Sequence, residues 1–227
     1  MPRAARFVVP GLPHHITQRG NHRERIFFRG DDHQQYLRVM AEECAANQVE
    51  IWAYCLMTNH VHLIAVPSSE KGFARAIGDA HRRYTYYVNA RQGWTGHLFQ
   101  SRFWSYVMDD GHLIAAARYV ECNPVKAGMV ALPWAYPWSS ALANLEARPD
   151  ILVRRNVMPG LVEDWRGLIL SALDERTERL VEEHSRSGLP LGSPEFVSRL
   201  ELESGRSFGQ KKRGRPFKRQ PELLPQQ

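Results

Sequence analysis

Residues 49–66 read VEIWAYCLMTNHVHLIAV, and this stretch decides the fold. Its two halves, residues 49–57 and 60–66, are rich in β-branched and aromatic side chains, and Thr58-Asn59 between them has turn chemistry. We therefore predict two antiparallel strands joined by a tight turn. A membrane-spanning helix is disfavoured for the same stretch, because Asn59 and two histidines lie inside it.

Two histidines occupy alternate positions of the second predicted strand. Side chains two residues apart on a strand point to the same face, so His60 and His62 can bind one metal ion. Val61, Leu63 and Ala65 then point to the opposite face, toward a core. Two hydrogen-bonded structural histidines are an equally open interpretation, since a buried imidazole needs only a hydrogen-bond partner.

The flanking sequence completes a longer pattern of elements. It predicts, in chain order, a strand at 13–20, a helix at 31–47, a helix at 72–93, a strand at 97–108, and a helix from 109 that ends at Asn123-Pro124. With the central strand pair, the order is β-α-β-β-α-β followed by a helix, which is that of a ferredoxin-like split βαβ sheet. We therefore predict an α+β fold whose antiparallel sheet carries helices on one face.

The sequence after residue 140 gives weaker signals, with helices expected near 162–184 and 193–203. The net charge of +6 arises at the end of the chain, because seven basic residues and no acid fall between Arg206 and Arg219. We expect a main domain over residues 1–140, a helical extension over 141–205 and a flexible basic tail over 206–227.

Charge and cysteine content indicate the partner and the compartment. Residues 71–102 hold six basic residues against the single acid Asp79, and together with the tail they indicate a polyanion such as nucleic acid. The three cysteines are far apart and form no CxxC pair, so neither a zinc site nor a disulfide framework is indicated. The N-terminus lacks a signal-peptide pattern. We expect a cytoplasmic, nucleoid-associated protein with no membrane partner.

A second informative segment, residues 118–124 (RYVECNP), pairs a tyrosine with an asparagine. On a helix Tyr119 and Asn123 are four residues apart and therefore neighbours. A tyrosine hydroxyl can act as a covalent nucleophile, and an amide oxygen is a hard ligand that suits Mg²⁺ or Mn²⁺. Alternatively, Tyr119 only packs in the core, and Asn123 only ends the helix before Pro124.

The other eight histidines lack a partner at metal-ligand spacing, and we interpret them as solvated or locally hydrogen-bonded. His14 and His15 would point to opposite faces of their strand. A histidine-triad hydrolase would need a third histidine where Ile64 stands, so that class of enzyme is excluded.

Together these segments resemble the HUH single-strand nucleases, and within them the one-tyrosine transposases related to IS200/IS605. The resemblance is to the REP-associated tyrosine transposases in particular. It rests on HHITQRGNHRERIF, MTNHVHLI, RRYTYYVN, GHLFQSRFWS, RYVECNPVKAGMV and YPWSS, which span about residues 10–140. The stretch from SGLPLGSPEFVSRLE to the basic tail also resembles the C-terminal extension of many members.

The resemblance implies a role for each residue of the two motifs. His60 and His62 would be ligands of Mg²⁺ or Mn²⁺, and Tyr119 would be the nucleophile. Asn123 would be the third protein ligand, in the place where insertion-sequence relatives often have glutamine. The implied activity is a metal-dependent single-strand endonuclease and strand transferase, which forms a 5′-phosphotyrosine link and frees a 3′-OH.

The resemblance also implies the DNA partner, single-stranded REP-like repeats that fold as hairpins, and it favours a monomer. We assign DNA contacts to Arg19, Arg82, Arg83, Arg102, Lys211, Lys212, Arg213 and Arg215, with neighbouring aromatic residues available for base stacking. Residues 213–216 (RGRP) match the core of an AT-hook, and a nonspecific electrostatic tether is equally open.

One alternative function remains beside the transposase. A domesticated protein could bind such hairpins without cutting them, although binding alone requires neither the histidine pair nor the tyrosine. A metal hydrolase for small phosphoesters is disfavoured by the two basic stretches and by the position of the tyrosine.

Overall fold

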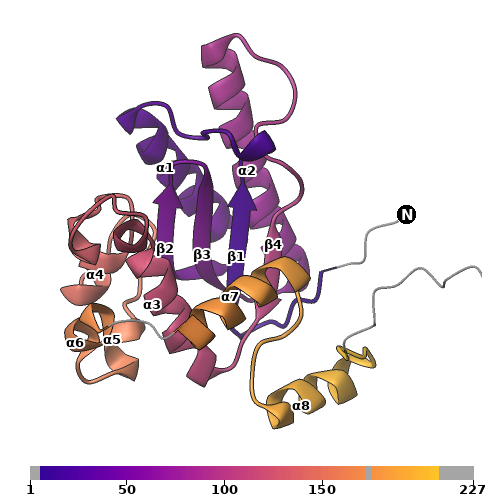
Figure 1. The fold of residues 1–227 in the computed structure, drawn as a ribbon. Coiled ribbons are helices and arrows are strands. Elements are labelled where there is room, and N and C mark those ends of the chain that lie inside the picture. The colour runs from indigo at the N-terminus through magenta and orange to yellow at the C-terminus, as the bar shows by residue number, and fades with distance from the viewer. Residues whose placement is uncertain (1–5, 172–174, 210–227) are drawn as a thin grey trace, which may run out of the picture.

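A four-stranded antiparallel sheet lies at the centre of the computed structural model, which describes residues 6–171 and 175–209 (Figure 1). The strands are β1 (His14–Arg19), β2 (Val49–Met57), β3 (His60–Pro67) and β4 (Trp104–Val107), in the order β2-β3-β1-β4. This order and the antiparallel pairing confirm the predicted α+β, split βαβ fold.

Two helices cover one face of the sheet, α1 (Gly30–Ala46) and α2 (Glu70–Gln92). They pack on strand residues such as Ile16, Tyr54 and Leu63, which form one hydrophobic core with them. Local sequence sets the ends of α2, because the Ser69 hydroxyl accepts the Gly72 backbone N–H and Gly93 adopts a left-handed conformation (φ 67°) after the last turn.

The opposite face of the sheet is also covered, by helices that follow the split βαβ unit in the chain. Here α3 (Asp110–Lys126) and α7 (Glu175–Ser187) contact the strands (Figure 1). A second core on this face contains Ala53, Cys55 and Ile64. The reason is that these apolar strand residues alternate with those of the first core, so both faces of the sheet exclude water.

Several elements of the C-terminal third of the chain pack against α3. This third contains four short elements, η2 (Pro133–Ala135), α4 (Ala141–Leu145), α5 (Met158–Leu161) and α6 (Trp165–Leu170), and then α7 and α8 (Pro194–Ser204). Glu121 of α3 joins several of them, since its buried carboxylate accepts hydrogen bonds from Ser140, Asn144 and Trp165. The predicted helical extension therefore packs on the main domain rather than apart from it.

Two predicted boundaries are wrong. The strand expected at 97–108 is paired as β4 only from Trp104, because residues 98–100 instead bond to the end of β1 and to the short helix η1 (Asn21–Arg23). The helix α3 does not end at Asn123 but continues through Pro124 to Lys126. A proline there removes one backbone N–H donor, and the Pro124 ring is buried.

Candidate active site

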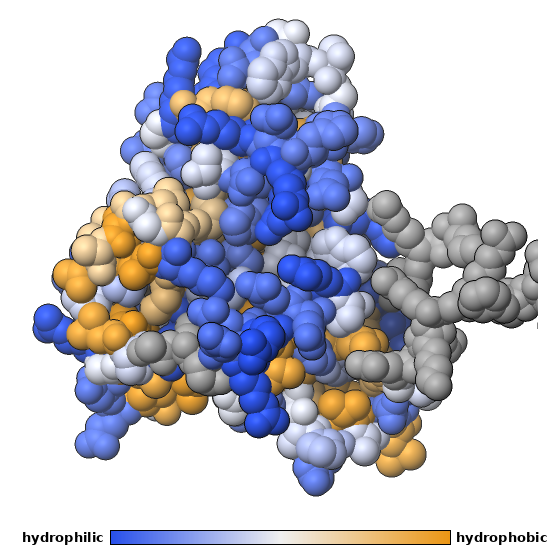
Figure 2. Space-filling view, in the orientation of Figure 1, coloured by the Kyte–Doolittle hydropathy of each residue, from blue (hydrophilic) through white to orange (hydrophobic). Residues whose placement is uncertain are grey.

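A cavity of about 410 Å³ opens beside the two histidines of β3. His60, His62, Tyr119 and Arg19, all four predicted from sequence, line it together. They come from β1, β3 and α3, so the fold brings together residues that are up to 100 positions apart in sequence. The face of the molecule over α7 is mostly hydrophilic at its middle, and apolar side chains gather instead over α4, α5 and α6 (Figure 2).

The two histidines of β3 each have one ring nitrogen occupied. Nδ1 of His60 donates to Asn59 Oδ1 at 2.7 Å, and the Asn59 amide nitrogen donates in turn to Arg23 O. Nδ1 of His62 lies 3.0 Å from His15 Nε2. Burial lowers the pKa of His60 to about 4 and that of His62 well below its usual value, so both rings are neutral near pH 7.

His15 is one of the site residues that the sequence did not predict. It is fully buried on β1, and its Nδ1 lies 3.0 Å from the Tyr106 hydroxyl and 3.3 Å from Ser185 Oγ. Its contacts are therefore long-range, and the expectation of a solvated or locally bonded ring is wrong for this histidine. The predicted opposite orientation of His14 and His15 is confirmed, because His14 packs on Phe73 in the other core. Thr17 of β1 pairs with His62 of β3, and His15 lies two residues before Thr17, on the same face of the strand. This alternation was the sequence signal for the contact.

Tyr119 lies directly against this histidine pair. Its ring centroid is 5.6 Å from that of His62, edge to face, and 6.3 Å from that of His15. Burial, and next the charge of Glu182, raise the pKa of Tyr119, while a hydrogen bond from Asn123 and the charge of Lys126 oppose this rise. The hydroxyl is therefore protonated at neutral pH.

Asn123 is next to Tyr119 on α3, as the four-residue spacing predicted. Its amide nitrogen lies 3.5 Å from the Tyr119 carbonyl oxygen. Because α3 continues past it, Asn123 is not a helix stop. Among the described residues no group of three His, Cys, Asp or Glu side chains could hold a metal, so a metal here would depend on the two histidines and this amide.

Helix α7 forms another wall of the cavity, and no sequence motif predicted this. Glu182, Ser185 and Arg186 line the cavity from this helix. Lys126 ties α7 to α3, since its ammonium lies 2.7 Å from Glu178 and 3.5 Å from Glu182 and also 5.6 Å above the centre of the Tyr119 ring. The positive side chains of the cavity are Arg19, Arg23 and Arg186, against the single carboxylate of Glu182 among the described lining residues.

The other predicted DNA-binding residues lie away from this cavity. Arg82 and Arg83 are on α2, where Arg82 pairs with Asp79 and Arg83 pairs with Glu42 and Glu43 of α1. Arg102 lies in the segment before β4 and lines a second pocket. The tail residues Lys211, Lys212, Arg213 and Arg215 are outside the described residues.

Comparison with known proteins decides the family. A family model described as "Transposase IS200 like" matches residues 8–123, more than half of the chain, and the match includes His60, His62, Tyr119 and Asn123. The chain belongs to the IS200-like transposase family. This IS200-like chain also has no helix, within residues 6–171 and 175–209, that combines the length and the apolarity needed to cross a bilayer.

Two proteins illustrate what this IS200-like transposase resembles. A REP-associated tyrosine transposase of Haemophilus influenzae is 26% identical over 144 residues, which cover 59% of this chain and 76% of the relative. A solved structure of a REP-associated tyrosine transposase bound to a REP hairpin matches with a TM-score of 0.56 at 19% identity. That match covers 67% of this chain and 90% of the other, and it shows the shared fold.

Proposed function

We propose that this chain is a metal-dependent endonuclease and strand transferase for single-stranded DNA, which cleaves REP-like hairpins through a 5′-phosphotyrosine intermediate. The observation that carries the proposal is the contact of Tyr119 with His62 in one arginine-lined cavity. Membership of the IS200-like family supports transposase chemistry. The hairpin substrate is supported by the similar fold of a transposase solved with a REP hairpin.

His60, His62 and Asn123 would hold the divalent cation, Mg²⁺ or Mn²⁺. Both imidazoles suit this role, because they are neutral and their Nδ1 atoms are engaged, so that Nε2 is the nitrogen available to a metal. The amide oxygen of Asn123 is a hard ligand that completes a mixed nitrogen and oxygen set. A cation bound there would polarise the scissile phosphate and stabilise negative charge on its oxygens.

The residues of the chain would carry out the covalent step. The Tyr119 hydroxyl oxygen attacks the phosphorus in line, an O–P bond to tyrosine forms, and the bond from phosphorus to the 3′ oxygen breaks. Glu182 lines the same cavity and can accept the tyrosine proton, while the departing 3′ oxygen takes a proton from solvent. Arg19, Arg23 and Arg186 would bind the phosphates on either side.

Strand transfer would be the same step in reverse, with a new 3′-OH attacking the phosphotyrosine, and it needs no ATP because the covalent link stores the phosphodiester energy. The described residues of the cavity come from several elements, among them β1, β3, α3 and α7. The proposal includes a protein that acts as a monomer, as the resemblance implies.

The test is incubation of the wild-type protein with end-labelled single-stranded hairpin DNA and Mn²⁺ or Mg²⁺, analysed on a denaturing gel. We expect a single nick and a covalent protein–DNA adduct, both lost when EDTA removes the metal. Tight hairpin binding without cleavage under either metal would instead favour the domesticated binding protein.

His15 should affect metal binding although it would not touch the metal. His62 can offer Nε2 only if its Nδ1 carries the proton, and His15 Nε2 is the acceptor within 3.0 Å for that proton. We therefore expect His15→Leu to weaken Mn²⁺ binding by about 10- to 100-fold, measured by calorimetry in the absence of DNA.

Restoring an acceptor at this position should restore most of the metal affinity. The side chain of His15→Gln can place an amide oxygen near the former Nε2, so we expect metal affinity within about 5-fold of wild type. Equal metal affinity in His15→Leu and wild type would show that His15 only fills space.

A further inference from the structure

Trp104, the first residue of β4, lies on the same face of the sheet as His62. Thr17 of β1 pairs with His62 of β3 on one side and with Trp104 on the other, and paired residues of neighbouring strands point to one face. Two interstrand spacings, roughly 10 Å at the backbone, therefore separate Trp104 from His62. Trp104 and Thr17 both line the Tyr119 cavity, so the indole forms its wall at the edge strand of the sheet.

The Trp104 side chain is exposed, and among the described residues it has no partner. Half of the residue is accessible to solvent (50%), and it belongs to none of the hydrophobic cores. In the part of the chain that the structure describes, no other ring stacks on the indole, no cation lies over it, and its N–H donates no hydrogen bond. Tyr106, two residues further along β4 on the same face, is by contrast 1% exposed and packs against His15. Single exposed apolar side chains are common on protein surfaces, but Trp104 lies in an arginine-lined cavity.

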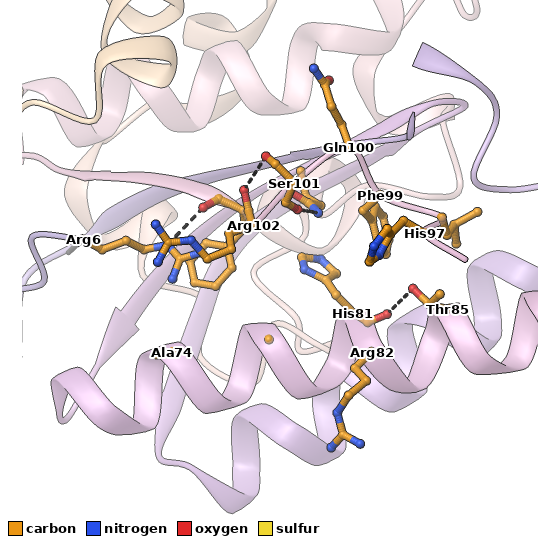
Figure 3. Close-up of a pocket in the computed structure, with 14 residues that line it drawn as sticks. Arg6, Ala74, His81, Arg82, Thr85, His97, Phe99, Gln100, Ser101 and Arg102 are labelled. Carbon is orange, nitrogen blue, oxygen red and sulfur yellow. Dashed lines mark hydrogen bonds between the residues drawn. The ribbon is translucent and has the colours of Figure 1, made fainter. Parts of the chain in front are cut away.

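The second pocket, on the α2 side of the sheet, presents no exposed Phe, Tyr or Trp ring among its described residues. Its volume is about 600 Å³, and it contains the buried rings of His81, Phe99 and Phe103. Arg6, at one end of it, covers the face of the Phe103 ring with its guanidinium at 3.6 Å, and Gln100 points away from α2 (Figure 3). Gln100 lines the Tyr119 cavity as well. Among the described residues of that cavity, the exposed aromatic side chain is Trp104.

Unpaired positive charge lies in the same cavity as the indole. Arg19 and Arg23 line the cavity, and within the described residues neither forms an ion pair. Burial, and next the charge of Arg23, lower the pKa of Arg19, so the two guanidinium groups repel each other and favour a bound anion. Single-strand binding sites combine such a positively charged groove with aromatic side chains on which bases stack.

We propose that Trp104 stacks on the base of a nucleotide next to the cleaved bond, while Arg19 and Arg23 contact phosphates of the same strand. The inference rests on the proposed function for the identity of the strand, single-stranded DNA, and it adds the residue that holds a base. Stacking is tolerant of sequence because every base has a π-face, so Trp104 fixes the position of the strand in the cavity without selecting which base it holds.

Replacing the indole tests the stacking contact. Binding is measured in the Tyr119→Phe background, so that no strand is cut, with fluorescent hairpins that carry single-stranded thymine flanks. We expect Trp104→Leu to bind these hairpins about 10-fold more weakly, because it keeps an apolar side chain but has no π-face, and Trp104→Phe to stay within about 3-fold of the parent. Trp94→Leu is the matched control, since Trp94 is also 50% exposed but lies outside the cavity, and its binding should not change.

An abasic site moved along the flanks one nucleotide at a time identifies the stacked base. At one position, loss of the base should weaken binding by the parent protein about 10-fold and have no further effect on Trp104→Leu, because both changes remove the same contact. At the other positions the abasic site should have equal effects on the two proteins.

Two results would overturn the proposal. Equal binding by Trp104→Leu and Trp94→Leu would show that the indole does not contact the strand. A loss in Trp104→Leu that stays the same wherever the abasic site is placed would show that no base stacks there. If the wild type cleaves DNA but no abasic position is coupled to Trp104, the proposed function stands and this inference fails. If the wild type never cleaves DNA but the coupling remains, the stacking site stands and the proposed function fails.

Discussion

Tyr119→Phe is expected to abolish the covalent protein–DNA adduct and to lower strand cleavage by at least about 10³-fold, because it removes the attacking oxygen. The ring stays in place, edge to face with His62 at a centroid distance of 5.6 Å. Hairpin affinity should therefore stay within about 3-fold of wild type, and the free energy of unfolding within about 1 kcal/mol. Cleavage is followed on a denaturing gel with labelled hairpin and Mn²⁺.

Tyr86→Phe is the matched control, because Tyr86 is an exposed tyrosine on α2 and lies outside the cavity. It loses the same hydroxyl group and should cleave like wild type. A covalent adduct that persists in Tyr119→Phe would assign the nucleophile to another residue. Equal loss of cleavage in both variants would show that the effect does not come from the site.

As the pH is lowered, the protein should unfold at a pH well above that at which most carboxylates become protonated. The reason is that His14 and His81 are buried as neutral rings. Nδ1 of His14 donates to Leu12 O and its Nε2 accepts the Val9 backbone N–H, while His81 Nε2 lies 2.9 Å from the Tyr36 hydroxyl. Burial lowers the pKa of His14 to about 4 and that of His81 to about 3. The unfolded chain binds these protons at about pH 6.5.

The sign follows from proton binding in the two states. Between about pH 6.5 and pH 4 the unfolded chain holds more protons at these histidines than the folded chain, so the free energy of unfolding falls as the pH falls. Each histidine contributes on the order of 3 kcal/mol, and the total stability of a domain is about 5–15 kcal/mol. Glu121 acts in the opposite direction, because burial raises its pKa to about 7. The two histidines outweigh it.

The measurement is the melting temperature by circular dichroism across this pH range. His81→Gln removes one of the titrating groups, so its melting temperature should fall less steeply with acid than that of wild type, whatever its value at pH 7. A melting temperature that stays constant from pH 7 to pH 4.5 would contradict the prediction.

Much of the fold and part of the site could be predicted from sequence because they depend on local periodicity. The turn at Thr58-Asn59 between two β-rich runs gave the β2–β3 pair, and strand alternation placed His60 and His62 on one face. Helical spacing made Tyr119 and Asn123 neighbours on α3. The histidine pair and the Tyr119–Asn123 pair link residues at most four positions apart, and the strand pair is joined by a two-residue turn, so local backbone geometry fixes all three relations.

Only the tertiary structure brought α3 over the histidines and α7 over Tyr119. The contact of His15 with His62 joins residues 47 positions apart, and the contact of Ser185 with His15 joins residues 170 apart. Such contacts leave no periodic signal, since they arise from the covering of the second sheet face by helices. That covering follows from the alternating apolar residues of β2 and β3, such as Cys55 and Ile64. The sequence by itself determined which side chains share a strand or a helix face, and packing of distant elements decided which of them meet.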